Sequence, residues 1–187
     1  QVSPVDKQGI RRLPISSSPE IFDNSIQAWF KDMTNYDLSL MKFAFKAASE
    51  MATALQLNEE AAHWKEVEEQ LPAFDVDEEG SLTFAKGFPY DQSHRHFSHA
   101  MSIHPLGLID YSQGEESQRI INATIKRLQD VGPDYWCGYS YSWFGNMKAR
   151  AFDGEGAARE LKTFAECFCL PNTFHANGDP TKSGKSK

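Results

Sequence analysis

Four of the six histidines of this 187-residue chain lie within SHRHFSHAMSIHP, at positions 93–105. Imidazole groups can bind a metal ion, transfer a proton, hydrogen-bond to a ligand or simply pack. His96 and His99 are three residues apart and would share one face of a helix. A zinc site would need further ligands with carboxylates behind them, and the sequence has no H-E-x-x-H motif and no suitably spaced Cys or Asp. We therefore expect no metal and no cofactor, and we expect His99 and His104 to be hydrogen-bonded structural residues.

The triplet His94, Arg95 and His96 lies where a long polar connection meets a predicted helical stretch. Imidazole and guanidinium groups both carry directed hydrogen-bond donors, so the triplet is suited to binding hydroxyl groups. All three side chains are therefore candidate substrate-binding residues.

A second candidate group is Glu20, the last residue of SSSPE at 16–20. Ile21 and Phe22 follow it, and apolar neighbours disfavour the charged form of a carboxyl group. This context predicts a raised pKa, which suits a general acid that protonates a leaving group. The simpler alternative is an exposed glutamate or one that caps a helix.

The third candidate is the aromatic run DYWCGYSYSWF at 134–144. It has too many aromatic side chains for one buried stripe, and aromatic faces stack on the apolar faces of sugar rings. Tyr139, Trp143 and Asn146 are therefore candidates for lining a sugar pocket, and Arg150 is an alternative to Asn146 as a residue facing a polar cavity. Packing in the core stays open for Trp143 and Phe144.

The composition excludes several classes of partner. The net charge is −7, and no run of Lys or Arg occurs before the C-terminal tail. Nucleic acid and anionic membrane surfaces would therefore find no basic footprint. No apolar stretch approaches the roughly 20 residues that a membrane span needs. The three cysteines are an odd number and do not form a disulfide framework.

A long helix is predicted from about Asp37, with its start capped by Asn35 or Asp37. Its apolar residues recur at steps of three and four: Leu38, Met41, Phe45, Ala48, Ala52 and Leu55. A second helix is predicted over about 59–71, and Pro72 follows its end. The inward-facing residues of this second helix are Ala62, Val67 and Leu71.

Further helices are predicted over about 97–103, 115–131, 139–152 and 155–168, with DGEG at 153–156 as the last turn. Residues 72–95 form a long connection, and such connections are usually functional or wrap another element. No strand alternation competes, so the fold class is all-α, with a helical hairpin repeated about three times. We expect an irregular N-terminal segment at 1–34 that carries Glu20, a helical-hairpin portion at 35–179 and a polar tail at 180–187.

Several of these segments together resemble the catalytic domain of the inverting α-L-fucosidases of glycoside hydrolase family 95. The segments are SSSPE at 16–20, NYDLSLMKFAFKAA at 35–48, QLPAF at 70–74, HRHFSH at 94–99, GYSYSWFGNMKARAFDGEGA at 138–157 and NTFHANGD at 172–179. The similarity runs in order from about Leu13 to Asp179. Its specific element is HRHxSH followed by a helix with a Gly-aromatic-Ser-x-x-Trp pattern.

The resemblance implies an (α/α)6 toroid, of which this chain would form about three of six hairpins around a sugar pocket. It implies that Glu20 is the general acid and that Trp143 lines the pocket. It also implies a substrate-binding histidine within HRH, at His94 or His96, with His96 favoured. The implied partner is an oligosaccharide or other glycan, and the implied location is secreted or periplasmic.

Two departures from the family pattern matter. An inverting enzyme needs a water-activating group opposite the acid, and the resemblance places it on asparagines of an upstream hairpin and on an acidic residue beyond this chain. We therefore expect a piece of a longer chain that is inactive without the remainder. NTFHANGD also departs from the usual family segment, which makes another α-L-sugar, such as L-galactose, an alternative substrate.

Two other functions stay open at the level of sequence. One is a toroidal polysaccharide lyase, in which Tyr139 or Tyr141 with His96 abstracts a proton from a uronate. Its positive charge would come from Arg95, Lys148 and Arg150. The other is a carbohydrate-binding or helical-repeat interaction fragment without catalysis.

Overall fold

The computed structural model describes residues 3–178, which form an all-α fold without a β-sheet. The α-helices of this part are α1 (Asn35–Ala54), α2 (Asn58–Glu69), α3 (Glu115–Val131), α4 (Gly138–Arg150) and α5 (Gly154–Phe168). The short 3-10 helices are η1 (Ile21–Asn24), η2 (Ile26–Ala28), η3 (Ser98–Ala100) and η4 (Tyr111–Gln113). The polar tail expected at 180–187, and Asp179 before it, lie outside the described residues.

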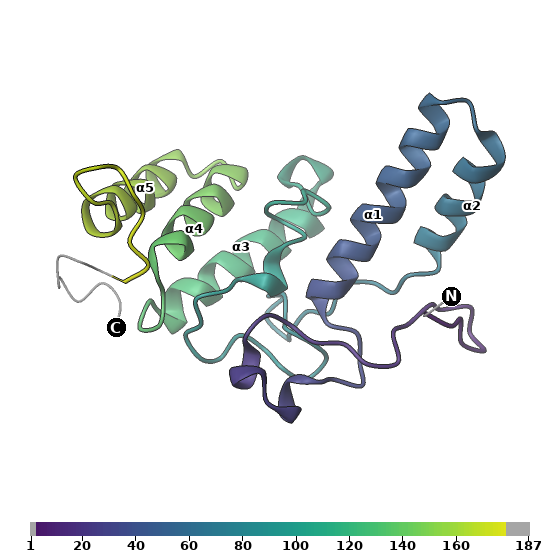
Figure 1. Cartoon of the computed structure of the whole chain (residues 1–187), viewed down its shortest axis with the longest axis horizontal. Helices are drawn as coiled ribbons and strands as arrows, with labels where there is room; N and C mark the ends of the chain where they lie inside the picture. The colour runs from purple at the N-terminus through teal and green to yellow at the C-terminus, as the bar shows by residue number, and fades with distance from the viewer. Residues whose placement is uncertain (1–2, 179–187) are drawn as a thin grey trace.

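The helices form successive hairpins, as expected for part of an (α/α)6 toroid. Figure 1 shows the α1–α2 hairpin at one end of the molecule, the α4–α5 hairpin at the other and α3 between them. In the middle hairpin, η3 and the turns that follow it take the place of a first helix before α3. The N-terminal segment and the long connection lie together along one side of the helices (Figure 1).

The start of α1 differs from the expected cap. Thr34 is the N-cap residue, and its hydroxyl accepts a hydrogen bond from the amide of Asp37. The Asn35 side chain instead donates to the carbonyls of Asp75 and Thr83, at 2.8 Å each, and accepts from the amide of Asp75. The prediction of Asn35 or Asp37 as the cap was therefore wrong, because the Asn35 amide anchors the long connection to α1.

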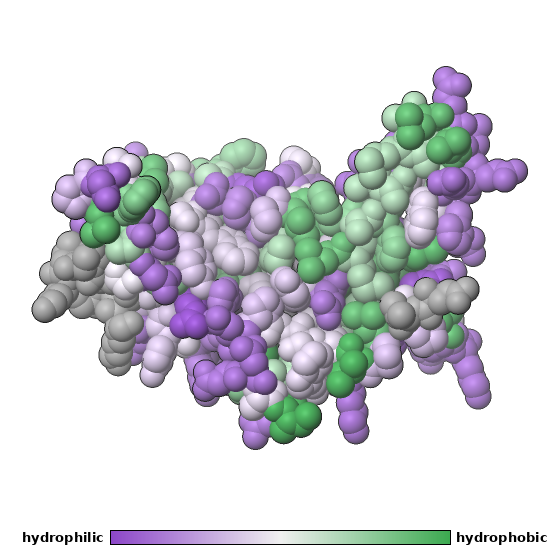
Figure 2. All heavy atoms as spheres, in the orientation of Figure 1, coloured by the Kyte–Doolittle hydropathy of each residue, from purple (hydrophilic) through white to green (hydrophobic). Residues whose placement is uncertain are grey.

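The α1–α2 hairpin has a thin core of its own. Phe45 of α1 stacks on Trp64 of α2, with ring centroids 5.7 Å apart and nearly parallel planes. Leu55 lies beyond the end of α1 and is exposed, so it does not belong to the helix face on which it was predicted. Ala62 of α2 is also exposed, so its predicted inward position was wrong. Figure 2 shows hydrophobic surface over this end of the molecule. Its exposed large apolar side chains are Phe43, Met51, Leu55 and Leu57.

The α4–α5 hairpin is closed by a short turn. The Asp153 carboxylate accepts from the amide of Gly156, and α5 therefore begins at Gly154, inside the predicted DGEG turn. Lys148 of α4 is buried and pairs with Glu160 of α5, at 2.7 Å between Nζ and Oε1. This ion pair fixes the two helices to each other.

The main core lies between α3, α4 and the long connection. Leu82, Phe84 and Tyr90 of the connection are buried there. Ile21 and Phe30 of the N-terminal segment pack in the same core. The boundary expected at residue 34 stays a prediction, since residues on its N-terminal side share the core of the helices. Within the described residues, no helix combines the length and apolarity required to cross a bilayer.

Candidate active site

Glu20 lies in a turn whose backbone is unusual for non-glycine residues. Glu20, Phe22, Asp23 and Asn24 have φ values of 57, 48, 51 and 56°, in the left-handed region. Each costs about 1 kcal/mol or more relative to the ordinary conformation. The Asn24 side chain accepts from the amide of Glu20 at 3.1 Å and holds the turn closed. The strained backbone lies at the residue predicted to be the general acid, and strained conformations of this kind are common in active sites.

The loop that carries the histidine–arginine triplet is fixed from two sides. The Tyr90 hydroxyl accepts from the amide of His94 at 2.8 Å and donates to its carbonyl at 3.0 Å. From α4, the Ser140 hydroxyl donates to the carbonyl of Arg95 at 2.7 Å. The long connection and the start of α4 therefore set the position of the triplet.

All three residues of the triplet contact Glu20. The Arg95 guanidinium forms an ion pair with Glu20 Oε2, and His96 Nε2 lies 2.9 Å from the same oxygen. His94 Nε2 is 3.2 Å from the main-chain oxygen of Glu20. The Tyr139 hydroxyl lies 3.1 Å from each ring nitrogen of His96. The structure thus brings together five of the predicted site residues, which lie between positions 20 and 139 of the sequence.

The protonation of Glu20 differs from the expectation. Burial acts to raise the pKa of Glu20, but hydrogen bonds and charge from His96 and Arg95 outweigh it, so the pKa lies below its usual value. The predicted raised pKa is wrong for this state, because Ile21 and Phe22 do not enclose a carboxyl group that remains 40 % exposed and reaches two donors. At neutral pH, Glu20 is a carboxylate.

His96 is neutral beside this carboxylate. Burial lowers the pKa of His96, and the contact with Glu20 only partly offsets that effect. Two effects disagree here. A positive charge on His96 contributes to the lowered pKa of Glu20, whereas burial of the His96 ring favours its neutral form. Burial decides, because the His96 ring is only 24 % exposed. A neutral ring whose Nε2 carries the proton still donates to Glu20 and leaves Nδ1 to accept from Tyr139.

Trp143 and Asn146 lie on the same face of α4 as Tyr139, because they follow it by four and seven residues. Trp143 is half-buried and donates from Nε1 to the carbonyl of His104 at 2.9 Å. Asn146 is exposed and donates to the carbonyl of Ser142. Neither makes a hydrogen bond with Glu20 within the described part of the chain. They continue the face of α4 that begins at Tyr139.

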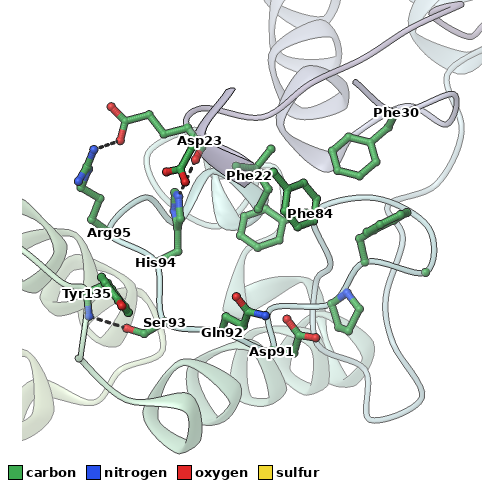
Figure 3. Close-up of a pocket in the computed structure, with 15 residues that line it drawn as sticks. Phe22, Asp23, Phe30, Phe84, Asp91, Gln92, Ser93, His94, Arg95 and Tyr135 are labelled. Atoms are coloured by element: carbon green, nitrogen blue, oxygen red, sulfur yellow. Dashed lines mark hydrogen bonds and ion pairs between the residues drawn. The ribbon is translucent and has the colours of Figure 1, made fainter. Parts of the chain in front are cut away.

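A cavity of about 510 Å³ opens beside Glu20 and is shown in Figure 3. Arg95, His94 and Tyr135 lie on one side of it, and phenylalanine side chains lie on the other (Figure 3). Sequence reasoning missed most of these lining residues. The signal that could have found them is the aromatic and glycine-containing run LTFAKGFPYD inside the long connection.

Two expectations about neighbouring residues have different outcomes. His104 Nδ1 accepts from Arg150 at 3.3 Å, as expected for a hydrogen-bonded histidine, and this contact turns Arg150 toward His104. His99 is completely buried, and neither ring nitrogen has a partner among residues 3–178. The prediction of a hydrogen-bonded His99 was therefore wrong. Phe84 and Tyr90 hold its ring by packing alone.

In the described region, no group of three or more His, Cys, Asp or Glu side chains is placed to hold a metal ion. Cys137 and Cys169 are free thiols. The chemistry available at Glu20 is therefore that of a carboxyl group, imidazole, guanidinium and phenol.

The fold and the site together define a carbohydrate-active domain of the α/α type. Its helical hairpins present a carboxyl group, imidazole and guanidinium donors and an aromatic helix face beside a cavity. A family model described as the glycosyl hydrolase family 95 catalytic domain matches residues 3–182, and the chain belongs to this family. No curated protein matched the chain significantly. The chain is thus part of a glycoside hydrolase, and its substrate is a glycan.

Proposed function

We propose that this glycoside hydrolase removes terminal α-L-fucosyl or related α-L-sugar units with inversion of configuration, and that Glu20 is its general acid. The observation that carries the proposal is the joint contact of Arg95 and His96 with the Glu20 carboxyl group at the rim of a cavity. A carboxyl group in this position can donate its proton to a glycosidic oxygen.

The other predicted residues have binding roles in this proposal. His94, Arg95 and His96 offer donors to sugar hydroxyl groups. Tyr139, Trp143 and Asn146 form a continuous face of α4 on which the sugar ring lies. Aromatic rings on such a face complement the apolar face of a pyranose, and the amide at its end can take a hydroxyl group.

A general acid must carry a proton, and Arg95 opposes this in the free protein because its charge favours the carboxylate. The Arg95 side chain is 47 % exposed, so a ligand can reach it from solvent. A sugar hydroxyl group that takes its place would remove positive potential from the carboxyl group and raise the pKa of Glu20. In this proposal, substrate binding separates Arg95 from Glu20 before proton transfer.

Inversion also needs an activated water molecule on the opposite face of the sugar. We propose that its activating group comes from outside these 187 residues, so that the chain alone is inactive. The family resemblance favours a secreted or periplasmic location for the whole protein.

The lyase alternative is not favoured by the site. Burial, followed by the neighbouring Cys137, raises the pKa of Tyr139, and a phenol that stays protonated is a poor base. Tyr141 is buried, with its ring 5.2 Å from that of Phe168. Lys148 is buried against Glu160 and does not face a uronate.

The experiment is an assay of the native protein that contains this chain on aryl α-L-fucoside and aryl α-L-galactoside. We expect hydrolysis of at least one substrate, with the β-anomer of the sugar as the first product by proton NMR. On an α-L-fucosyl oligosaccharide, whose leaving sugar alcohol needs a proton, Glu20→Gln should lower kcat by about 10²–10⁴-fold, and Glu115→Gln, an exposed change at the start of α3, should leave it unchanged. Wild-type turnover in Glu20→Gln would exclude the acid assignment, a first product with the α-anomer would exclude inversion, and sugar binding without turnover would favour the non-catalytic alternative.

A further inference from the structure

The segment that carries Glu20 and the loop that carries His96 are joined by a buried hydrogen bond between two serine side chains. The hydroxyl groups of Ser18 and Ser98 lie 2.6 Å apart, and either can donate. We propose that Ser18 and Ser98 are a positioning pair, which holds the carboxyl group of Glu20 where it can protonate a bound glycosidic oxygen. This inference rests on the proposed function, because it takes Glu20 as the general acid.

The two serines are close along the chain to the groups that they would align. Ser18 precedes Glu20 by two residues, and Ser98 follows His96 by two. His96 Nε2 is 2.9 Å from Glu20 Oε2, so the serine hydrogen bond and this side-chain contact connect the same two segments side by side. A change in the spacing of Ser18 and Ser98 therefore reaches Glu20 through only two residues of backbone.

Ser98 is the member of the pair that the main core holds in place. It is buried and begins η3, and its neighbours Phe97 and His99 are completely buried. The Phe97 ring packs edge-to-face against Trp136 and Phe144, with ring centroids 5.1 and 6.3 Å away. Close-packed interiors leave such groups little freedom to move. The position of the Ser98 hydroxyl group is therefore set by the core and not by the acid segment.

The acid segment needs an anchor of this kind. Backbone hydrogen bonds of 3.0 and 2.7 Å between Ser16 and Phe30 close its base. Between them, the described backbone-to-backbone hydrogen bonds join residues three apart and so hold the segment only to itself. Ile21 adds apolar packing, which has no preferred direction. Strained residues such as Glu20 keep their conformation only where surrounding contacts enforce it, and Ser18 supplies a directed contact just before the strained turn.

Loss of either hydroxyl group should move the turn and change the acid. The remaining hydroxyl group would be buried without its partner, which favours a shift of Ser18 away from η3 and toward water. Burial acts to raise the pKa of Glu20, and the stronger combined effect of His96 and Arg95 lowers it. Both effects weaken when the turn moves, so the pKa of Glu20 should rise toward its usual value. A misplacement of about 1 Å can also lower the rate by about 10²-fold.

The test compares Ser18→Ala and Ser98→Ala with Ser39→Ala in the native protein that contains this chain. Ser39 is a matched control, because its hydroxyl group is also buried and also makes a hydrogen bond of 2.6 Å, but to the carbonyl of Asn35 within α1. Each variant is assayed over a range of pH on an α-L-fucosyl oligosaccharide and on α-L-fucosyl fluoride, whose leaving group departs with little help from an acid. The ratio of the two values of kcat/KM does not depend on the fraction of the sample that is folded.

We expect Ser18→Ala and Ser98→Ala to lower the maximal kcat/KM on the oligosaccharide by about 10- to 10²-fold, with little change on the fluoride. The alkaline limb of their pH profiles on the oligosaccharide should move to higher pH, because the pKa of Glu20 rises. The double variant should lose no more than either single variant, since each removes the same hydrogen bond. Ser39→Ala should change neither the ratio nor the pH profile.

Equal losses on both substrates, a loss that Ser39→Ala matches, or additive losses in the double variant would overturn the positioning role. Glu20→Gln, assayed in parallel, separates that result from a failure of the proposed function. If Glu20→Gln selectively loses turnover of the oligosaccharide and the serine variants do not, Glu20 remains the acid and the serine pair does not position it. If Glu20→Gln shows no selective loss, the acid assignment fails, and the positioning role fails with it.

Discussion

His99 makes the stability of this protein sensitive to acid in a way that can be calculated. Its ring is completely buried between Phe84 and Tyr90, and neither nitrogen has a partner among residues 3–178. Burial, together with the nearby His94, lowers the pKa of His99 to about 3. The folded protein therefore accepts only the neutral ring, whereas the unfolded chain can bind a proton.

The magnitude follows from proton linkage. With a pKa of 6.5 in the unfolded chain and about 3 in the folded protein, the stabilisation is complete above pH 6.5 and is lost as the pH falls. Between pH 7 and pH 5, the free energy of unfolding should decrease by about 2 kcal/mol through His99 alone. The total loss approaches about 5 kcal/mol near the folded pKa.

The assay is urea unfolding at pH 7 and pH 5, followed by tryptophan fluorescence, for the unsubstituted protein, His99→Leu and Ile103→Val. His99→Leu removes the titrating group, so its loss between the two pH values should be smaller by about 2 kcal/mol. Ile103→Val shortens a completely buried neighbour and should lower stability by about 1 kcal/mol, while keeping the full dependence on pH. If His99→Leu and the unsubstituted protein lose the same free energy, the account of His99 as a buried neutral ring is wrong.

Three other contacts give further predictions. Glu160→Ala should lower the free energy of unfolding by about 3–5 kcal/mol in urea unfolding, because it leaves Lys148 buried without Glu160. Lys148→Met should lower it by less, because the Glu160 side chain that it leaves behind is partly exposed. Tyr90→Phe removes a buried acceptor for two N–H groups and should cost about 1–3 kcal/mol in the same assay. Arg95→Gln should raise the pKa of Glu20 and move the alkaline limb of the pH profile of kcat/KM to higher pH, since a general acid loses activity as the pH rises through its pKa.

The helices could be predicted from the sequence because their signals are local. The three- and four-residue spacing of apolar side chains predicted α1, and α3 covers the predicted residues 115–131, with Gly114 and Gly132 at its two ends. The cap of α1 was missed for a reason that is not local. Asn35 has an excellent capping side chain, but it binds the backbone of the long connection some forty residues away.

The candidate site divides in the same way. The HRH triplet and Glu20 were predicted as chemical groups from their types and from a family motif, but their mutual contacts depend on the fold. The lowered pKa of Glu20 could not be read from Ile21 and Phe22, because Arg95 and His96 decide it from a distant loop. The cavity was missed because Phe22 and Phe88 come from separate irregular segments, and neither segment has a periodic signal.

The most direct test of the central claim is the dependence of the Glu20→Gln variant on the leaving group. A glycosyl fluoride needs little protonation to depart, whereas a sugar alcohol needs a full proton. If Glu20 is the acid, Glu20→Gln should lower kcat/KM on an α-L-fucosyl oligosaccharide by about 10²–10⁴-fold, with a far smaller loss on α-L-fucosyl fluoride. Equal losses on both substrates, or no loss on the oligosaccharide, would contradict the assignment of Glu20 as the proton donor.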